Sequence, residues 1–321
     1  MDRRYFAQGR LPGWSQQSLS EGTALIIGVG GLGLPAALYL AAMGIGRLIL
    51  ADPDTVAEEN LHRQPLYTTE SLGKLKVDVL AAHLQSLRPD LGIELHPVWA
   101  DEEFLLTVGR AAHIWIDGTD NLQSRLAIDR AASALRKPWV YGAIFQAEGQ
   151  VALLEGVSYT SLFGEGTEGP SCSEAGVIGA LPGIIGSWQA TLAAQYLAWA
   201  DIVPKNRLFR IDLRRGEIHT FWLSASVERL EALEISLEEV RLLQDPLWID
   251  IREEASPPPP FAGERRAWYD WDKWSLPPKP IVILCEAGNR SRQIAYALRK
   301  LTGRKDIYSL RQGSLGLMKS E

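Results

Sequence analysis

The chain has 321 residues, of which 46% are hydrophobic and 22% charged, so it can bury a large core and is not a disordered protein. Its net charge is −6 and its Lys and Arg residues are scattered, which argues against nucleic-acid binding, because phosphate-tracking proteins gather a basic stripe. Two cysteines are too few for a disulfide framework, and no apolar segment follows the charged N-terminus, so we expect no signal peptide and a cytoplasmic protein.

Two uncharged stretches, residues 22–46 and 175–200, raise the question of membrane spans. The first contains clustered glycines and Pro35, which suit a strand, a turn and a helix. The second contains Pro182 and Gln189, which suit a helix buried in protein better than one in lipid. We therefore expect no contact with a membrane.

Strands and helices alternate along the chain up to about residue 138. Strands are predicted at 24–28, 47–51, 92–98 and 113–117, and helices at 33–43, 74–88, 101–108 and 121–135. This order is typical of a doubly wound, Rossmann-like parallel sheet. Further strands are predicted at 139–144, 149–155, 207–213 and 217–223, and they extend the sheet with antiparallel strands.

A glycine-rich turn joins the first strand to the first helix. It holds Gly28, Gly30, Gly31 and Gly33, and it leads into a helix N-terminus whose unpaired N–H groups suit phosphate. Asp52 ends the second strand about 20 residues later, where a carboxylate can hold ribose hydroxyls. These residues alone fit an NAD-dependent oxidoreductase equally well.

The polar residues that follow separate the two interpretations. A triphosphate needs cations along its β and γ groups, and Arg63 and Lys76 are placed to supply them. Asp120 follows the strand at 113–117, so it lies at the same sheet edge as Asp52. Because Mg²⁺ favours one or two carboxylates together with substrate phosphates, we expect Asp120 to be its ligand.

In order and spacing, these motifs resemble the HesA/MoeB/ThiF adenylyltransferases, relatives of ubiquitin-activating enzymes, from about Arg4 to Trp222. The matching segments include GVGGLG, LADPDTVAEENLHRQ, GKLKVD and IDGTDNLQSR. The resemblance implies ATP as substrate and the Gly-Gly carboxylate of a ubiquitin-like sulfur-carrier protein as acceptor, giving an acyl-adenylate and pyrophosphate. It also implies a homodimer, and it adds Asn60, Gln64 and Asn121 to the nucleotide site.

A second, smaller α/β domain is predicted from residue 227 to 321, after an adenylyltransferase domain at 1–226. The strand at 281–284 runs into Cys285-Glu286-Ala287-Gly288-Asn289-Arg290-Ser291, which resembles the active loop of a rhodanese domain. Backbone N–H groups and a helix N-terminus around the thiol would favour thiolate and persulfide. Cys285 is therefore predicted to carry sulfur, received from a donor such as a cysteine desulfurase.

The chain departs from both families at named positions. Glu286 stands where rhodanese domains have a basic residue, and Ala7 stands where relatives carry an arginine that reaches the partner subunit's ATP. Cys172 and Cys285 are too few for a tetrahedral zinc site, so no zinc is predicted. Some relatives use a cysteine near position 172 for a covalent link to the carrier. A scaffold that binds a ubiquitin-like partner without catalysis is the alternative that these departures favour.

Overall fold

The computed structural model describes residues 2–163, 176–199, 202–223, 233–252, 263–285, 289–311 and 313–314. The chain divides into two compact units, one formed by Met1–Tyr159 and Glu165–Thr220 and the other by Thr160–Gly164 and Phe221–Glu321. The boundary predicted between residues 226 and 227 lies in segment 224–232, outside the described residues.

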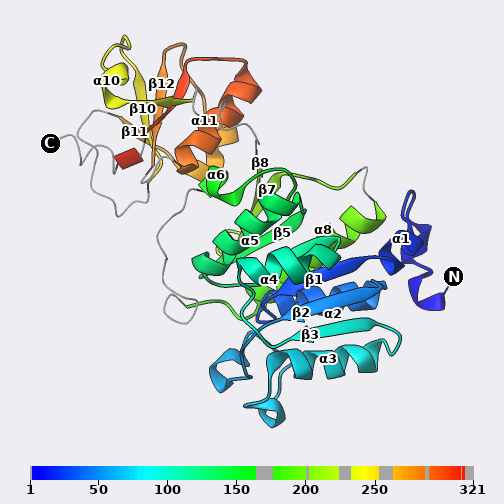
Figure 1. Ribbon diagram of the computed structural model, residues 1–321. Helices are drawn as coiled ribbons and strands as arrows, with labels where there is room; N and C mark the ends of the chain where they lie inside the picture. Colours follow the sequence, from blue (N-terminus) through cyan, green and yellow to red (C-terminus); the bar gives the residue numbers. More distant parts are fainter. Residues whose placement is uncertain are drawn as a thin grey trace. The chain divides into compact units, whose positions relative to one another are not determined.

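The first unit is built on an eight-stranded sheet in the order β3-β2-β1-β4-β5-β6-β7-β8 (Figure 1). The pairs from β3 to β5 are parallel, whereas β5 with β6 and β6 with β7 are antiparallel. This confirms the predicted Rossmann-like sheet with an antiparallel extension. The strands are β1 Thr23–Ile27, β2 Arg47–Ala51, β3 Gly92–His96, β4 Ile114–Asp117, β5 Trp139–Phe145, β6 Glu148–Leu154, β7 Arg207–Asp212 and β8 Glu217–Trp222.

Strand β1 is the point at which the strand order reverses, with β2 on one side and β4 on the other. All five residues of β1 are buried, as expected for a central strand covered on both faces. In doubly wound sheets, ligands bind at the carboxyl ends of the strands beside such a reversal. The fold therefore directs the search for a site to the ends of β1, β2 and β4.

Helices cover the first sheet, and short 3₁₀ turns connect several of its elements. The α-helices of this unit are α1 Gln16–Ser20, α2 Gly33–Met43, α3 Lys76–Leu87, α4 Glu102–Thr107, α5 Leu122–Leu135 and α8 Ala180–Ala198. Helix α6 Tyr159–Phe163 belongs, apart from Tyr159, to the second unit. The 3₁₀ helices are η1 Arg3–Tyr5, η2 Gln8–Arg10, η3 Glu58–Asn60, η4 Thr69–Ser71 and η5 Val108–Ala111.

Helix α8 is the long uncharged helix of the second half of this unit, and it packs against α2, β5 and β6. Gly186 lies so close to the Leu32 carbonyl that a side chain there would overlap it. This close approach requires a glycine at position 186 of the apolar 19-residue helix and lets the helix pack tightly against the chain around Leu32. Among the described helices, none is both long and apolar enough to cross a bilayer.

The second unit contains a five-stranded sheet in the order β11-β10-β12-β13-β9, with all described pairs parallel. Its strands are β9 Glu234–Ile235, β10 Leu247–Asp250, β11 Glu264–Arg265, β12 Ile281–Leu284 and β13 Ile307–Leu310. Its helices are α10 Leu237–Val240, η6 Trp268–Lys273 and α11 Asn289–Thr302. Ile249, Ile283 and Ile294 form part of its core, against which Trp268 and Trp271 pack. That this unit is a rhodanese domain stays a prediction.

Candidate active site

A pocket of about 340 Å³ opens at the carboxyl ends of β1, β2 and β4, where the sheet topology places a ligand. Of the eleven residues predicted to bind the nucleotide, all but Gly33 line it. They are Gly28, Gly30, Gly31, Asp52, Asn60, Arg63, Gln64, Lys76, Asp120 and Asn121. Residues separated by up to 93 positions in sequence, from Gly28 to Asn121, therefore form one site.

The glycine-rich turn forms the floor of the pocket. Gly28 has a φ of +81°, which favours glycine, and its N–H donates to the Ala51 carbonyl at 2.8 Å. A Cβ at Gly30 would meet only Gln64, 3.4 Å away, so this position leaves its space to the pocket. Gly33 does not line the pocket, and a Cβ there would overlap the Gly28 carbonyl oxygen, so a glycine at this position closes the turn. Its contact with the nucleotide stays a prediction.

Asp52 is held by the turn that it faces. Its carboxylate accepts hydrogen bonds from the N–H of Val29 at 2.7 Å and of Asp54 at 2.8 Å. Burial raises the pKa of Asp52 above its ordinary value of 3.8, although those two N–H groups and the charge of Lys76 oppose the shift. The side chain is thus fixed at the strand end.

Lys76 lies at the start of α3 with its side chain only 5% exposed. Its Nζ pairs with Asp54 Oδ2 at 2.7 Å. Tyr67 donates from its hydroxyl to the Val29 carbonyl at 2.8 Å and also contacts the Lys76 carbonyl, so it ties α3 to the glycine-rich turn. A buried ammonium group therefore borders the pocket, paired with Asp54, while Tyr67 holds the backbone of Lys76.

Arg63 and Gln64 follow the 3₁₀ helix η3. The Arg63 guanidinium donates to the Asn60 side-chain oxygen and to the Glu59 carbonyl, so Arg63 and Asn60 line the pocket as a pair. Gln64 is buried, and its Oε1 has no hydrogen-bond partner among the described residues. A buried polar atom without a partner is costly, and a polar ligand in the pocket would satisfy it.

Asp120 and Asn121 form the far wall. Asp120 is exposed, whereas Asn121 caps α5 by accepting a hydrogen bond from the Ser124 N–H at 2.8 Å. Within the described ranges, no group of three or more His, Cys, Asp or Glu residues could hold a metal ion. A single carboxylate such as that of Asp120 is enough for Mg²⁺ when substrate phosphates and water supply the other ligands.

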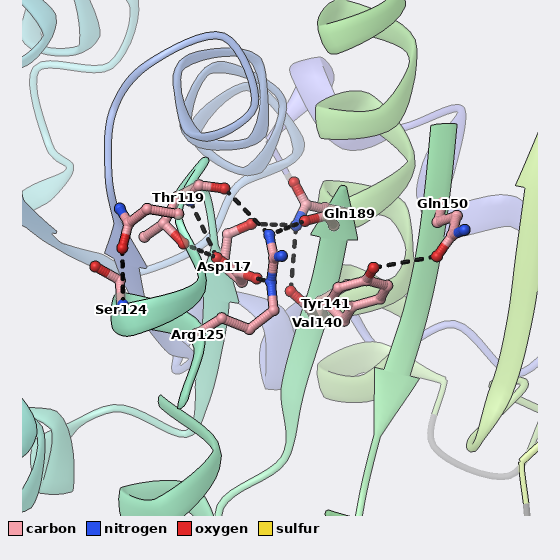
Figure 2. A network of polar contacts seen from close by, with 10 residues as sticks. Asp117, Thr119, Ser124, Arg125, Val140, Tyr141, Gln150 and Gln189 are labelled. Atoms are coloured by element: carbon pink, nitrogen blue, oxygen red, sulfur yellow. Dashed lines mark hydrogen bonds and ion pairs between the residues drawn. The ribbon is translucent and has the colours of Figure 1, made fainter. Parts of the chain in front are cut away.

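Sequence reasoning missed a buried ion pair behind this wall, between Asp117 of β4 and Arg125 of α5 (Figure 2). The Arg125 Nε lies 2.9 Å from Asp117 Oδ2, and Arg125 also lines the pocket. Burial alone would lower the pKa of Arg125, but the Asp117 carboxylate raises it, so the guanidinium stays charged. In the sequence, this ion pair is indicated only by an arginine, Arg125, one turn into the helix that follows Asp120.

Val98 and Trp99, which no sequence motif indicated, also line the pocket beyond β3. Both side chains are large and exposed, at 42% and 48%. A strand was predicted through residue 98, but β3 ends at His96. These residues therefore lie in the loop at the carboxyl end of the sheet, where they offer an apolar surface to a flat ligand.

Of the two cysteines, the structure describes Cys285. Cys285 follows β12, is 3% exposed, and its Sγ lies 3.4 Å from the Ser291 N–H and 3.3 Å from the Ser291 hydroxyl. That hydroxyl in turn lies 2.8 Å from the Ser309 hydroxyl. Glu286 to Gly288 and Cys172 lie outside the described residues. A polar contact to the thiol from the start of α11 is therefore present.

Comparison with known proteins finds similar adenylyltransferases. The chain is 39% identical over 193 residues to a sulfur carrier protein adenylyltransferase of Thermus thermophilus, which covers 57% of this chain and 71% of that protein. It is 35% identical over 219 residues to the sulfur carrier protein ThiS adenylyltransferase of Escherichia coli, covering 67% and 85%. It is 36% identical over 203 residues to the adenylyltransferase and sulfurtransferase MOCS3 of Anopheles gambiae, and the match covers 61% of this chain and 46% of that protein.

A solved structure shows the same fold. The crystal structure of Escherichia coli MccB with MccA-N7isoASN matches with a TM-score of 0.62 at 19% identity, covering 70% of this chain and 73% of that chain. The ThiF family matches residues 4–230, which include every residue of the pocket. This match speaks against the oxidoreductase interpretation. The chain belongs to the ThiF family.

Proposed function

We propose that this chain uses ATP to adenylylate the C-terminal glycine carboxylate of a ubiquitin-like sulfur-carrier protein. The observation that carries the proposal is one pocket in which the glycine-rich turn, Asp52, Arg63 and Lys76 come together. Two of the relatives are named as adenylyltransferases of a sulfur carrier, which supports this substrate class.

The residues of the pocket have distinct tasks in this proposal. Asp52 would hold the ribose, and the floor at Gly30 leaves room for the phosphates. Arg63 and Lys76 would meet the charge that develops on the departing pyrophosphate. A carboxylate is already a nucleophile, so its attack on the α-phosphorus needs positioning and no general base.

Asp120 would hold Mg²⁺ against the phosphates, where the ion supplies further charge stabilisation. The single carboxylate suits an ion whose other ligands come from substrate and water. We include Mg²⁺ in the proposal for this reason.

Carrier-dependent exchange of labelled pyrophosphate into ATP tests the proposed function. Lys76→Ala should lower the exchange rate about 100-fold, because it removes a buried cation that would meet the charge developing on the pyrophosphate. Lys74→Ala is the matched control, since Lys74 is exposed and does not line the pocket. Parental exchange by the Lys76 variant would contradict the proposal, and absence of exchange in the parent chain would favour a non-catalytic scaffold.

We further propose that Cys285 delivers sulfur. The terminal sulfur of a Cys285 persulfide would attack the acyl carbon, break its bond to AMP and form an acyl disulfide. A second thiol would then attack the Cys285 sulfur, release the thiocarboxylate and leave Cys285 in a disulfide. Cys285→Ser should keep pyrophosphate exchange and abolish thiocarboxylate formation, which mass spectrometry of the carrier detects. A cysteine desulfurase as donor, a homodimer and a cytoplasmic location remain predictions.

A further inference from the structure

The Asp117 carboxylate is completely buried at the end of β4 and accepts three hydrogen bonds from Thr119 and Arg125, which line the pocket. Arg125 Nε donates at 2.9 Å, and Thr119 donates from its N–H at 3.0 Å and from its hydroxyl at 2.6 Å. A buried charge needs such compensation. The carboxylate thus fixes the amide side of Thr119.

Arg125 fixes the carbonyl side of the same residue. Its Nη2 contacts the Thr119 carbonyl at 3.4 Å and donates to the Gly142 carbonyl of β5 at 3.1 Å. The guanidinium also lies over the Tyr141 ring at 5.1 Å, between β4 and β5 (Figure 2). One side chain therefore joins β4, β5 and the loop between β4 and α5.

That loop carries Asp120 into the pocket. Among the described residues, no hydrogen bond or ion pair holds the Asp120 side chain itself. Its neighbours are held, because Thr119 is bonded on both sides and Asn121 caps α5. The position of the Asp120 carboxylate consequently depends on the backbone on which it stands.

We propose that Arg125 is a positioning residue that sets where Asp120 stands in the pocket, an inference that rests on the proposed function. Arg125 does this by clamping Thr119 against Asp117 and Gly142. A lysine at position 125 could keep the ion pair with Asp117. A single ammonium group cannot also match the fork of donors that reaches Thr119 and Gly142.

A double-mutant cycle between Arg125→Lys and Asp120→Asn tests the inference in carrier-dependent exchange. Arg125→Lys should lower kcat about tenfold with the KM for ATP within about twofold, since a small misplacement of a catalytic group is costly. In the Asp120→Asn background the same change should cost nothing further, because the group being positioned is gone. Arg130→Lys is the matched control, as Arg130 lies on the same helix in an exposed pair with Glu102.

Thr119→Val tests the clamp from its other side and keeps the ion pair intact. It should lower kcat in the parent background and have no effect in the Asp120→Asn background. If the two changes of either cycle lowered kcat independently, so that their effects multiplied in the double variant, the inference would be overturned. A general loss of stability would give that result.

Amide hydrogen exchange of a peptide spanning residues 118–121 gives a readout that does not need activity. Arg125→Lys should speed exchange of these amides about tenfold, and Arg130→Lys should leave it unchanged. Unchanged exchange in the Arg125 variant would overturn the inference even if the chain proves to be an active adenylyltransferase. Faster amide exchange in a chain without pyrophosphate exchange would retain the clamp and overturn the proposed function.

Discussion

Lys76 and Asp54 form an ion pair whose two members lie in different surroundings, with the lysine side chain 5% exposed and the carboxylate 61% exposed. The ammonium group has left water, whereas its partner remains in it. A phosphate entering the pocket would meet the Lys76 ammonium group already removed from water. It could then replace the exposed Asp54 carboxylate as the partner of that group.

Asp54→Asn should therefore make the ligand-free chain less stable and more responsive to ATP. Loss of the pair leaves a buried cation without its anion, which we expect to cost about 1 kcal/mol because Asp54 is exposed. That corresponds to a fall in Tm of about 2–4 °C. Thermal melts with and without ATP and Mg²⁺ measure this, and the ATP-induced rise should be larger in the variant. Asp78→Asn on the same helix is the control, and an equal rise in both variants would contradict the prediction.

Gly33→Ala should destabilise the fold. Its Cβ would overlap the Gly28 carbonyl oxygen, which is main chain and cannot rotate away, so we expect a loss of about 2–3 kcal/mol. Gly183→Ala is a matched change in α8 with open space around it, and it should gain about 0.5–1 kcal/mol through helix propensity. Urea unfolding measures both, and equal effects of the two changes would refute the packing argument.

Gly30→Ala should separate binding from folding. A Cβ there reaches Gln64 Nε2 at 3.4 Å, which is an ordinary contact, so the urea midpoint should stay within error of the parent. The methyl group would occupy pocket space, and we expect ATP affinity to fall about tenfold or more, from calorimetric titration. Parental affinity in this variant would mean that phosphates do not pass over the turn.

Stability should fall with rising pH because of Asp52. Burial raises its pKa, so from about pH 4 upward the folded chain keeps a proton that the unfolded chain has released. The native state then binds more protons, and the free energy of unfolding decreases as pH rises through the raised pKa. Asp52→Asn does not titrate at this position, so the parent should lose stability relative to this variant as the pH rises from about 4 through the raised pKa of Asp52. A relative gain in urea unfolding experiments over this range would contradict the sign.

The sequence predicted the central elements closely because their patterns are strong. The helix predicted at 33–43 is observed as Gly33–Met43, since it begins after the glycine-rich turn and ends at Gly44 in a left-handed conformation. The strand predicted at 92–98 ends two residues early, and its last residues became the exposed part of the pocket wall. Alternation of residue types cannot distinguish the end of a strand from a loop that continues it.

The site was predictable where a residue faces the ligand and less so where it supports one. Asp52 and Asp120 could be assigned to a common edge because both follow parallel strands, whose carboxyl ends meet at one edge of the sheet, and both line the pocket. The role of Arg125 depends on Gly142, 17 residues away on another strand, which no local spacing reveals. At Gly33 the backbone of Gly28 fills the space of the missing side chain, and a sequence does not show whether such space belongs to a ligand or to the backbone.

Three glycines explain how this site can be altered and how it cannot. Side chains at Gly33 or Gly118 would overlap the Gly28 carbonyl, and one at Gly28 would approach Gly118 to 2.9 Å. At these three positions the turn is consequently bare peptide packed against peptide, and side chains cannot be introduced there without moving the backbone. Attempts to redesign nucleotide preference should begin at Trp99, where bulk can be removed without disturbing the scaffold.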